Sequence, residues 1–417
     1  MIKVRADLGL LLKLVTYEQV QQTIRNSINL IGYEIVRTEN AHGRILTDDV
    51  TVAQDQPTFD KAAVDGYAID SSTAKSATRT SPASYEIVGE VFPDDASENR
   101  IKPDQTFYVS CGSRIPQAAD CVVKAELVEK QNGTIKLSSP IAHGKNISYT
   151  GEDFKVGTKL FSSYHKLRPQ DIAALLATGH IKVKVLKRPV AGVLSVGSEL
   201  TDARNPTKGC LVNDHAYVLL GFLREFEVET VNLGVCPDET EKISAKLRDA
   251  IQKCDIVITL GGTSVGKKDL VPNAILSLGA KEMFHGMRMS PGKVNGLMMV
   301  REKPVVMLAG HIVTALAGFF TIVVPILQHM QNMSKQMKVV SAVLAEDAKM
   351  KAGMDRFLLV HIKNIDGQQI ATPFGLDTNL LSSLVSANAY SIVPSDSEPK
   401  AGESLEFHPL NLSGSEL

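Results

Sequence analysis

The chain has 417 residues, of which 44% are hydrophobic and 22% are charged, and its net charge is −1. At roughly 100–200 residues per domain this length predicts two to four domains, and the near-neutral charge argues against a nucleic-acid or membrane surface. The 5 cysteines show no C-x-x-C and no metal-ligand spacing, which favours reduced residues of a cytoplasmic protein. The apolar run 8–15 lacks a cleavage site and 322–327 contains Pro325, so neither a signal peptide nor a membrane span is expected.

The first part of the chain is predicted to combine helices with a β domain. Apolar residues recur at helical spacing in 17–30, and a second helix is expected over 169–177. Short β-rich runs alternate with turns over 51–139 without a helical period, which predicts an inserted β subdomain. We assign 1–50 and 140–187 to an N-terminal helical/β subdomain.

The fold class predicted for the whole chain is multidomain α/β plus β. Strands and helices alternate over 188–336, which predicts a doubly wound α/β domain. In such sheets ligands bind at the carboxyl ends of the strands. The last segment, 337–417, has short strands separated by Gly, Pro and Ser turns, and this pattern predicts a small β-barrel or sandwich.

The stretch 255–269, DIVITLGGTSVGKKD, is a buried-type strand that breaks into a glycine-rich turn. Glycines there let main-chain N–H groups approach an anion, and Asp269 adds a carboxylate that could hold Mg²⁺ against a phosphate. The spacing is neither the Walker nor the Rossmann pattern, and a bare Gly-Gly after a strand is more often only a tight turn. Three more loops are expected at the same edge of the sheet, and their convergence favours an anion site: 197–199, 290–293 and 310–311.

Two acidic motifs lie outside the α/β domain. One is 59–69, FDKAAVDGYAI, with carboxylates at Asp60 and Asp65; the other is Gly151-Glu152-Asp153. Taken singly, each is more often a solvated turn than a functional site. A functional role for either motif therefore needs support from the rest of the chain.

Together these motifs resemble the molybdopterin molybdenumtransferase family, which includes the MoeA proteins and the C-terminal region of gephyrin. The resemblance covers essentially the whole chain. It rests mainly on Phe59-Asp60-x-x-Ala63-x-Asp65-Gly66-Tyr67-Ala68, Gly151-Glu152-Asp153 and Gly261-Gly262-x-Ser264-x-Gly266-x-x-Asp269. It implies a MogA-like α/β domain that binds molybdopterin and a C-terminal β-barrel.

The resemblance also implies the reaction. Family members insert molybdate, or tungstate, into adenylated molybdopterin and release AMP, with Mg²⁺ as cofactor. They form homodimers, for which a molybdopterin adenylyltransferase is a possible partner, and Asp65 and Asp153 of one subunit would face the loop 261–269 of the other. The catalytic residues implied are Asp65, Asp153 and Asp269, and the metal ligands are Asp269 and Glu199. The implied substrate-binding residues are Ser198, Gly261, Gly262, Thr263, Ser264, Gly266, Pro291, Gly292, Lys293, Gly310, His311 and Thr314.

Several positions depart from the family pattern. Where the family usually has Pro-Gly-Asn-Pro-Val-Ser, this chain has Ala309-Gly310-His311-Ile312-Val313-Thr314, and where the family has a lysine it has Ser290. Arginines are common at the positions of Ser148-Tyr149-Thr150, and the usual Asp-Ser/Thr-Asn is here Asn213-Asp214-His215. Several of these changes remove positive charge or a donor from the expected anion site. A diverged, non-catalytic paralogue that binds a pterin or nucleotide ligand, or a protein partner, is therefore an alternative, and a phosphate-ester hydrolase is a third.

Overall fold

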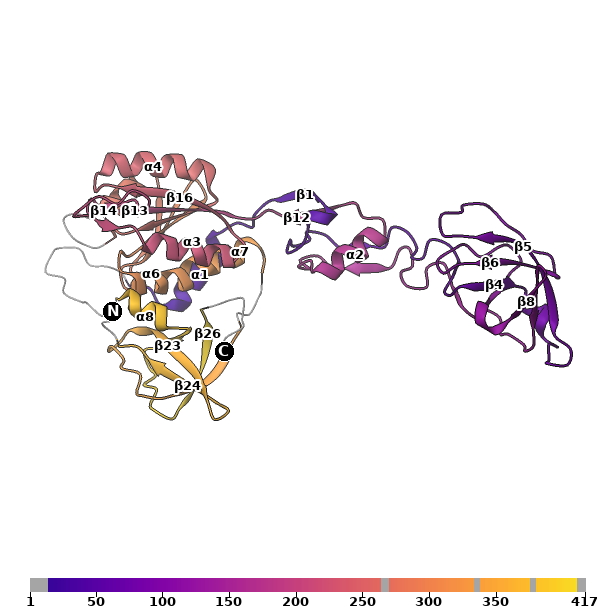
Figure 1. The fold of residues 1–417 in the computed structure, drawn as a ribbon. Coiled ribbons are helices and arrows are strands. Elements are labelled where there is room, and N and C mark those ends of the chain that lie inside the picture. Colours follow the sequence, from indigo (N-terminus) through magenta and orange to yellow (C-terminus); the bar gives the residue numbers. More distant parts are fainter. Residues whose placement is uncertain (1–13, 264–269, 334–337, 376–379, 411–417) are drawn as a thin grey trace. The chain divides into compact units, whose positions relative to one another are not determined.

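The computed structural model describes residues 14–263, 270–333, 338–375 and 380–410 (Figure 1). The chain divides into two compact units, one of residues 33–186 and one that joins residues 1–32 to 187–417. Each unit has its own sheets and its own core, so each is described separately.

The unit of residues 33–186 contains the predicted inserted β domain. Its main sheet has six strands in the order β7-β4-β6-β5-β9-β8. The strands are β4 (Gly66–Ile69), β5 (Ala83–Val91), β6 (Gln105–Val109), β7 (Cys121–Lys124), β8 (Glu129–Gln131) and β9 (Thr134–Leu137). Tyr67, Tyr85 and Ile135 belong to the core of this sheet, and the helical content of the segment is limited to short 3₁₀ turns among the described residues.

The rest of this unit is a small helical/β part. Strand β1 (Tyr33–Arg37) pairs antiparallel with β12 (Lys182–Leu186), and α2 (Pro169–Ala177) has the bounds expected from the sequence. Asp171 is 2% exposed and accepts hydrogen bonds from the Arg168 main chain and side chain, which caps the helix start. The short pairs are β2 (Val50–Thr51) with β11 (Lys159–Phe161), and β3 (Lys61–Ala62) with β10 (Ile147–Ser148).

The second unit contains the predicted α/β domain. Its sheet has the order β16-β13-β17-β21-β20-β18, in which the first four strands are parallel and the last two are antiparallel. The strands are β13 (Val190–Val196), β16 (Glu229–Cys236), β17 (Ile256–Leu260), β18 (Lys281–His285), β20 (Gly296–Val300) and β21 (Lys303–Leu308). The fold class is confirmed, whereas the antiparallel strands β18 and β20 were not anticipated.

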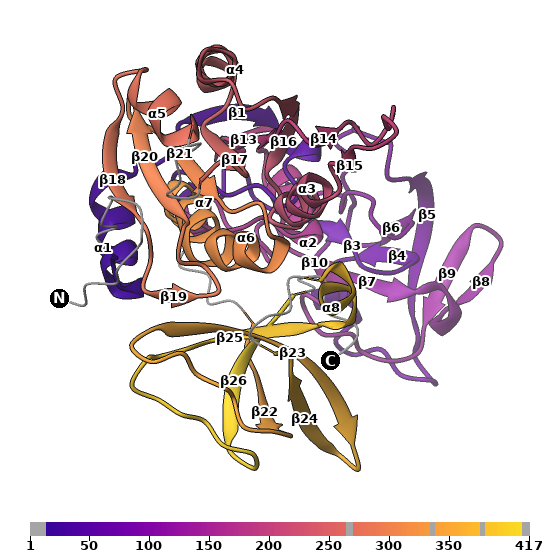
Figure 2. The same ribbon diagram turned by 90° about the vertical axis from the view of Figure 1, so that its left-hand side faces the viewer.

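Helices cover both faces of this sheet (Figure 2). On one face, α4 (Thr240–Lys253) and α5 (Leu270–Leu276) bury Ile243, Leu247 and Ile275. On the other, α3 (His215–Glu225) packs with the run from α6 (Ile312–Gly318) through a π-helical turn (Phe319–Val323) to α7 (Val324–Met330). Helix α1 (Tyr17–Ser27) buries Val20 and Ile24 in that same core.

The run Ile312–Met330 is, among the described residues, the one helix whose length and composition would allow it to cross a membrane. Its side chains are taken up by the fold instead, since 78% of its most apolar part is buried. Phe319, Phe320 and Ile322 lie in the core shared with α3 and α1. The run therefore behaves as the central core helix of this unit.

The C-terminal segment forms the expected β-barrel. Its strands are β22 (Val340–Leu344), β23 (Asp355–Ile365), β24 (Gln368–Pro373), β25 (Ala389–Val393) and β26 (Ser404–Pro409). They follow the order β23-β24-β22-β26-β25, and β25 pairs back with β23, which closes the barrel. The short strand β19 (Met289–Ser290) extends this sheet from the α/β domain, and α8 (Leu381–Ser386) precedes β25. Leu358, Val360 and Phe407 fill the interior.

Candidate functional site

A cavity of about 730 Å³ lies where the parallel strands of the α/β domain end. Strands β13, β17 and β21 each contribute the loop at their carboxyl end, as the doubly wound arrangement requires. The lining residues are Val196, Gly197, Glu199, Leu200, Leu211, Val212, Asn213, Asp214, His215, Asp238, Leu260, Gly261, Gly262, Thr263, Val294, Ala309, Gly310 and His311.

The glycine turn after β17 forms one wall of this cavity. Gly261 has φ +93°, and a Cβ there would lie 2.4 Å from the Val196 carbonyl oxygen. Gly262 has φ +66°, and its Cβ would meet Val271 Cγ2 at 2.7 Å. Both positions therefore need glycine for backbone conformation and for space. The turn brings main chain rather than side chains to the cavity, which is what close approach to a ligand requires.

A second wall joins the loops that follow β13 and β16. The Ser198 N–H donates to Asp238 Oδ2 at 2.8 Å, and the Asp238 N–H donates to Ser198 Oγ at 3.0 Å. The Gly197 N–H donates to the Cys236 carbonyl oxygen at 3.0 Å. Glu199 follows directly, so the position of its exposed carboxylate depends on these three bonds.

A β-bulge in the edge strand β16 sets the register of that wall. Val193 pairs with Asn232, but Ser195 pairs with Val235, so one extra residue is accommodated at Gly234, whose φ is +75°. A shift of one residue reverses the face to which each following side chain points. The bulge therefore determines which side chains of 235–238 point toward the cavity.

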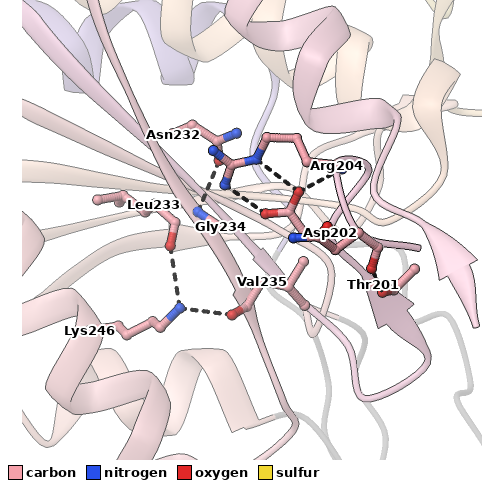
Figure 3. A network of polar contacts seen from close by, with 9 residues as sticks. Thr201, Asp202, Arg204, Asn232, Leu233, Gly234, Val235 and Lys246 are labelled. Atoms are coloured by element: carbon pink, nitrogen blue, oxygen red, sulfur yellow. Dashed lines mark hydrogen bonds and ion pairs between the residues drawn. The ribbon is translucent and has the colours of Figure 1, made fainter. Parts of the chain in front are cut away.

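Lys246 on α4 holds the bulge from one side (Figure 3). Its Nζ donates to the Val235 carbonyl oxygen at 2.7 Å and to the Leu233 carbonyl oxygen at 3.3 Å. These bonds give partners to main-chain carbonyl groups at the bulge, where the regular pairing with β13 is interrupted. Lys246 is thus linked through the bulge to Asp238 and Ser198.

The loop after β21 is fixed from two directions. The carbonyl oxygen of Gly310 accepts a hydrogen bond from His215 Nδ1 at 2.9 Å, which places the imidazole proton on that nitrogen. Asn295, fully buried, accepts from the Ala309 N–H at 3.0 Å and donates to the Thr314 carbonyl oxygen at 2.8 Å. These contacts hold the turn before α6, whose N-terminal residue lies beside the cavity.

Some predicted substrate-binding residues do not line the cavity. Pro291, Gly292, Lys293 and Thr314 lie outside its lining, although Val294 of the same loop contributes to it. Ser198 acts on the wall through Asp238 rather than by lining the cavity itself. Ser264, Gly266 and Asp269 fall outside the described residues, so their placement stays a prediction.

Asp65 and Asp153 both belong to the unit of residues 33–186. Both are exposed, and Asp65 Oδ1 accepts a hydrogen bond from the Cys111 N–H at 2.7 Å. The Asp153 N–H donates to the Gln56 carbonyl oxygen at 3.0 Å, which fixes the main chain from which its side chain projects. Both carboxylates are therefore held on ordered backbone and open to solvent.

Three consecutive parts of the chain match known family models. Residues 15–179 match the MoeA N-terminal region (domain I and II), residues 192–329 a probable molybdopterin binding domain, and residues 341–410 the MoeA C-terminal region (domain IV). A Bacillus subtilis (strain 168) protein named molybdopterin molybdenumtransferase is 32% identical over 369 residues, which cover 87% of this chain and 86% of that protein. The chain belongs to the MoeA family. The resemblance inferred from the motifs is confirmed.

Solved structures agree over nearly the whole chain. The molybdopterin biosynthesis MoeA protein of Pyrococcus horikoshii matches with a TM-score of 0.84 at 27% identity, covering 96% of this chain and 100% of that one. A second structure of a MoeA protein from that organism gives a TM-score of 0.72 at 31% identity. A Staphylococcus aureus (strain COL) relative named molybdopterin molybdenumtransferase is 26% identical over 94% of this chain and 95% of its own.

Two of the four departures from the MoeA pattern, at 213–215 and 309–311, lie at the cavity. Of the described lining residues, His215 and His311 occupy two of the altered positions, and Glu199, Asp214 and Asp238 supply carboxylates. No Lys or Arg is among these described lining residues. Sequence reasoning expected an anion site and did not identify Asp238 or Asn295, because neither belongs to a recognisable motif.

The Cys236 thiol, two residues before the lining residue Asp238, is poorly suited to act as a nucleophile. Cys236 is fully buried, and burial raises the pKa of its thiol. A thiol that stays protonated is a poor nucleophile. Cys236 contributes packing to the core and its main-chain carbonyl oxygen to the wall.

Proposed function

We propose that this chain is a molybdopterin molybdenumtransferase, which inserts molybdate into adenylated molybdopterin and releases AMP during molybdenum cofactor biosynthesis. The observation that carries the proposal is the cavity of about 730 Å³, because it is built from residues that match the molybdopterin-binding family model. Relatives named molybdopterin molybdenumtransferase along nearly the whole chain support the same activity.

The cavity offers suitable groups for a phosphorylated substrate. Gly261 and Gly262 present main chain without side chains, and the run that begins at Ile312 directs the positive end of its helix dipole toward the turn at Gly310-His311. The imidazole of His311 adds a donor. These groups would bind and orient the pyrophosphate of the adenylated substrate.

The family implies a divalent cation, Mg²⁺, and the cavity has the carboxylate oxygens that this ion prefers as ligands. Mg²⁺ takes oxygen ligands, keeps several waters and is commonly held by one or two carboxylates beside phosphates. Glu199 supplies such a carboxylate at the cavity, and Asp269 is the proposed second ligand. Within the described residues no three His, Cys, Asp or Glu side chains are grouped to enclose a metal by themselves. When bound, the ion would neutralise phosphate charge.

Asp65 and Asp153 are proposed to act on protons. Conversion of a molybdate oxygen to water needs two protons, and a positioned carboxyl group can deliver or relay them. Neither carboxylate can bind a bare oxyanion favourably at neutral pH. Both are exposed on ordered turns, which is compatible with a role toward a ligand supplied from solution.

The test is molybdate-dependent AMP release from adenylated molybdopterin. Asp65→Asn and Asp269→Asn should each nearly abolish release while leaving the unfolding transition unchanged. Asp104→Asn, an equal charge change at an exposed position of the same unit as Asp65, is the matched control and should stay active. Full activity in both site variants would reject the assignment.

A homodimer, a molybdopterin adenylyltransferase partner and a cytoplasmic location remain predictions. In the homodimer, Asp65 and Asp153 of one subunit would act together with the other subunit's α/β domain. Mixing Asp65→Asn and Asp269→Asn chains tests this directly. Mixed dimers would recover part of the AMP release if the two residues act across subunits, and no recovery would contradict the shared site.

A second candidate is a non-catalytic paralogue that binds a pterin or nucleotide. The acidic lining of the cavity favours it, because Glu199, Asp214 and Asp238 face an anionic substrate without a described Lys or Arg among the lining residues. Tight molybdopterin binding with no AMP release at any molybdate concentration would support this candidate over the transferase.

A further inference from the structure

The unit of residues 33–186 contains a second cavity, of about 370 Å³. This volume falls within the range of small-molecule sites, roughly 300–1,000 Å³. Among its lining residues are Phe59, Asp60, Glu98, Arg114, Gln117 and Thr150. None of the roles discussed above uses this cavity.

Arg114 is an exposed residue that lines this cavity and lies over an aromatic ring. Its guanidinium carbon lies 3.9 Å from the centre of the Phe59 ring, a cation–π contact that limits the freedom of the side chain. In the described part of the chain the guanidinium makes no ion pair and no side-chain hydrogen bond. Its planar set of N–H donors is therefore available, in a geometry suited to a pair of acceptors.

Two carboxylates share the cavity with this guanidinium. Asp60 Oδ1 accepts both the N–H and the hydroxyl of Thr150, at 2.8 and 2.7 Å, which fixes the carboxylate. Within the described residues, Oδ2 has no donor of its own and can accept from a ligand. Glu98 Oε2 accepts from Gln117 Nε2 at 3.4 Å, and the Gln117 N–H donates to the Asn99 carbonyl oxygen at 2.7 Å. The carboxylates are thus tied to ordered parts of the wall.

The charges select the class of ligand. Two carboxylates and one guanidinium among the titratable lining residues leave one negative charge in excess, which disfavours phosphate or any other free anion. A neutral ring that carries a pair of acceptors beside N–H donors can accept from the guanidinium and donate to the carboxylates. Guanine has such an edge: its carbonyl oxygen and ring nitrogen accept from arginine, and its amidine N–H groups can donate to carboxylates. A pterin presents the same arrangement.

We propose that this cavity binds the lactam–amidine edge of a bicyclic heterocycle, with Arg114 donating to the acceptor pair and Asp60 and Glu98 accepting from the N–H groups. Adenine reverses donor and acceptor along its edge and is excluded by the same contacts. The proposal stands on this cavity alone and does not depend on AMP release.

The test titrates the full-length chain with neopterin, followed by pterin fluorescence, and with guanosine and adenosine, followed by calorimetry. At least one of neopterin and guanosine should bind saturably, and the compound that binds shows whether the ring is a pterin or a guanine. Adenosine should not bind. Arg114→Met and Glu98→Gln should each weaken binding about 10-fold or more, the loss expected of one bidentate or carboxylate contact. Arg79→Met, an exposed arginine of the same unit outside the cavity, should leave it unchanged.

Three results would overturn the proposal. One is absence of saturation by neopterin and by guanosine up to about 1 mM, the weak end of specific binding. Another is equal binding of adenosine. The third is full retention of affinity in Glu98→Gln and in Arg114→Met, since a ring bound in the cavity of the α/β domain would survive both changes. Glu98 is exposed, so Glu98→Gln should fold normally and decides the question even if Arg114→Met folds poorly.

Discussion

Replacement of Lys246 by Met removes the ammonium group that holds the β16 bulge and keeps most of the aliphatic chain. Two hydrogen bonds are lost, to the Val235 carbonyl oxygen at 2.7 Å and to the Leu233 carbonyl oxygen at 3.3 Å. A hydrogen bond from a charged donor contributes about 1.5–3 kcal/mol, but water can reach these half-buried edge-strand carbonyls. We therefore expect a loss of about 1–2 kcal/mol, which lowers the melting temperature by about 2–8 °C.

The larger effect should be local. The register after the bulge determines the bonds of the Gly197 and Ser198 N–H groups to Cys236 and Asp238. Loosening of the bulge should increase hydrogen exchange of these two amides about 5-fold or more, because an opening that costs less free energy is populated more often. Strand β17 accepts neither of the two Lys246 hydrogen bonds, so its peptides should exchange at the wild-type rate.

Lys242→Met is the matched control. Lys242 lies one turn earlier on α4 and pairs with Glu239 at 2.8 Å, with both side chains exposed, so its removal should cost well under about 1 kcal/mol. Urea unfolding and hydrogen exchange by mass spectrometry measure both effects. If Lys246→Met loses stability while exchange at Gly197 and Ser198 stays at the wild-type rate, the link from the bulge to the cavity is wrong.

Four other changes test separate parts of the fold and the site. Gly261→Ala should lose at least about 2 kcal/mol in urea unfolding, because φ is +93° and the new Cβ meets a carbonyl oxygen. Asn295→Ala removes the side-chain partner of the buried Ala309 N–H and of the part-buried Thr314 carbonyl oxygen, so a loss of about 1–3 kcal/mol is expected in the same assay. The pKa of Asp171 is lowered, chiefly by a hydrogen bond from Arg168. The ionised Asp171 therefore stabilises the fold above about pH 4, and this stabilisation is lost as the pH falls further. The difference in unfolding free energy between the wild type and Asp171→Asn should shrink below that pH. Glu199→Gln should weaken Mg²⁺-dependent AMP binding about 10-fold in calorimetry, whereas AMP affinity without Mg²⁺ should not fall.

The elements that the sequence predicted best are those whose ends carry a local signal. Helix 169–177 has Pro169 at its first position and Asp171 in its first turn, where the carboxylate accepts from the Arg168 N–H, and both act within one turn. Strand 190–196 is an apolar run bounded by a proline and a glycine. In contrast, 296–300 is an antiparallel strand next to the parallel part of the sheet, and its pairing with β21 depends on chain reversal rather than on composition.

The site was predictable in outline because parallel strands end at one edge of a sheet. That rule placed Glu199, Gly261 and His311 in one cavity. It could not place Asp238, whose position depends on one extra residue at Gly234, because a bulge has no distinctive sequence pattern. Asn295 was missed for a related reason: its role comes from two main-chain partners that only the folded chain brings together.

The charge of the residues that line the cavity differs from the charge that the family pattern implied. The family pattern implied Lys293 as a substrate-binding residue, yet Lys293 lies outside the lining, and the described wall carries the carboxylates of Glu199, Asp214 and Asp238. Lys267 and Lys268 fall outside the described residues. Among the described residues, a polyanion bound there would be held by main-chain N–H groups, the dipole of the helix run from Ile312 and a bound cation that offsets the carboxylates. In that arrangement the acidic wall makes affinity conditional on the cation, so a nucleotide without its metal would be rejected by the same residues that hold the loaded form.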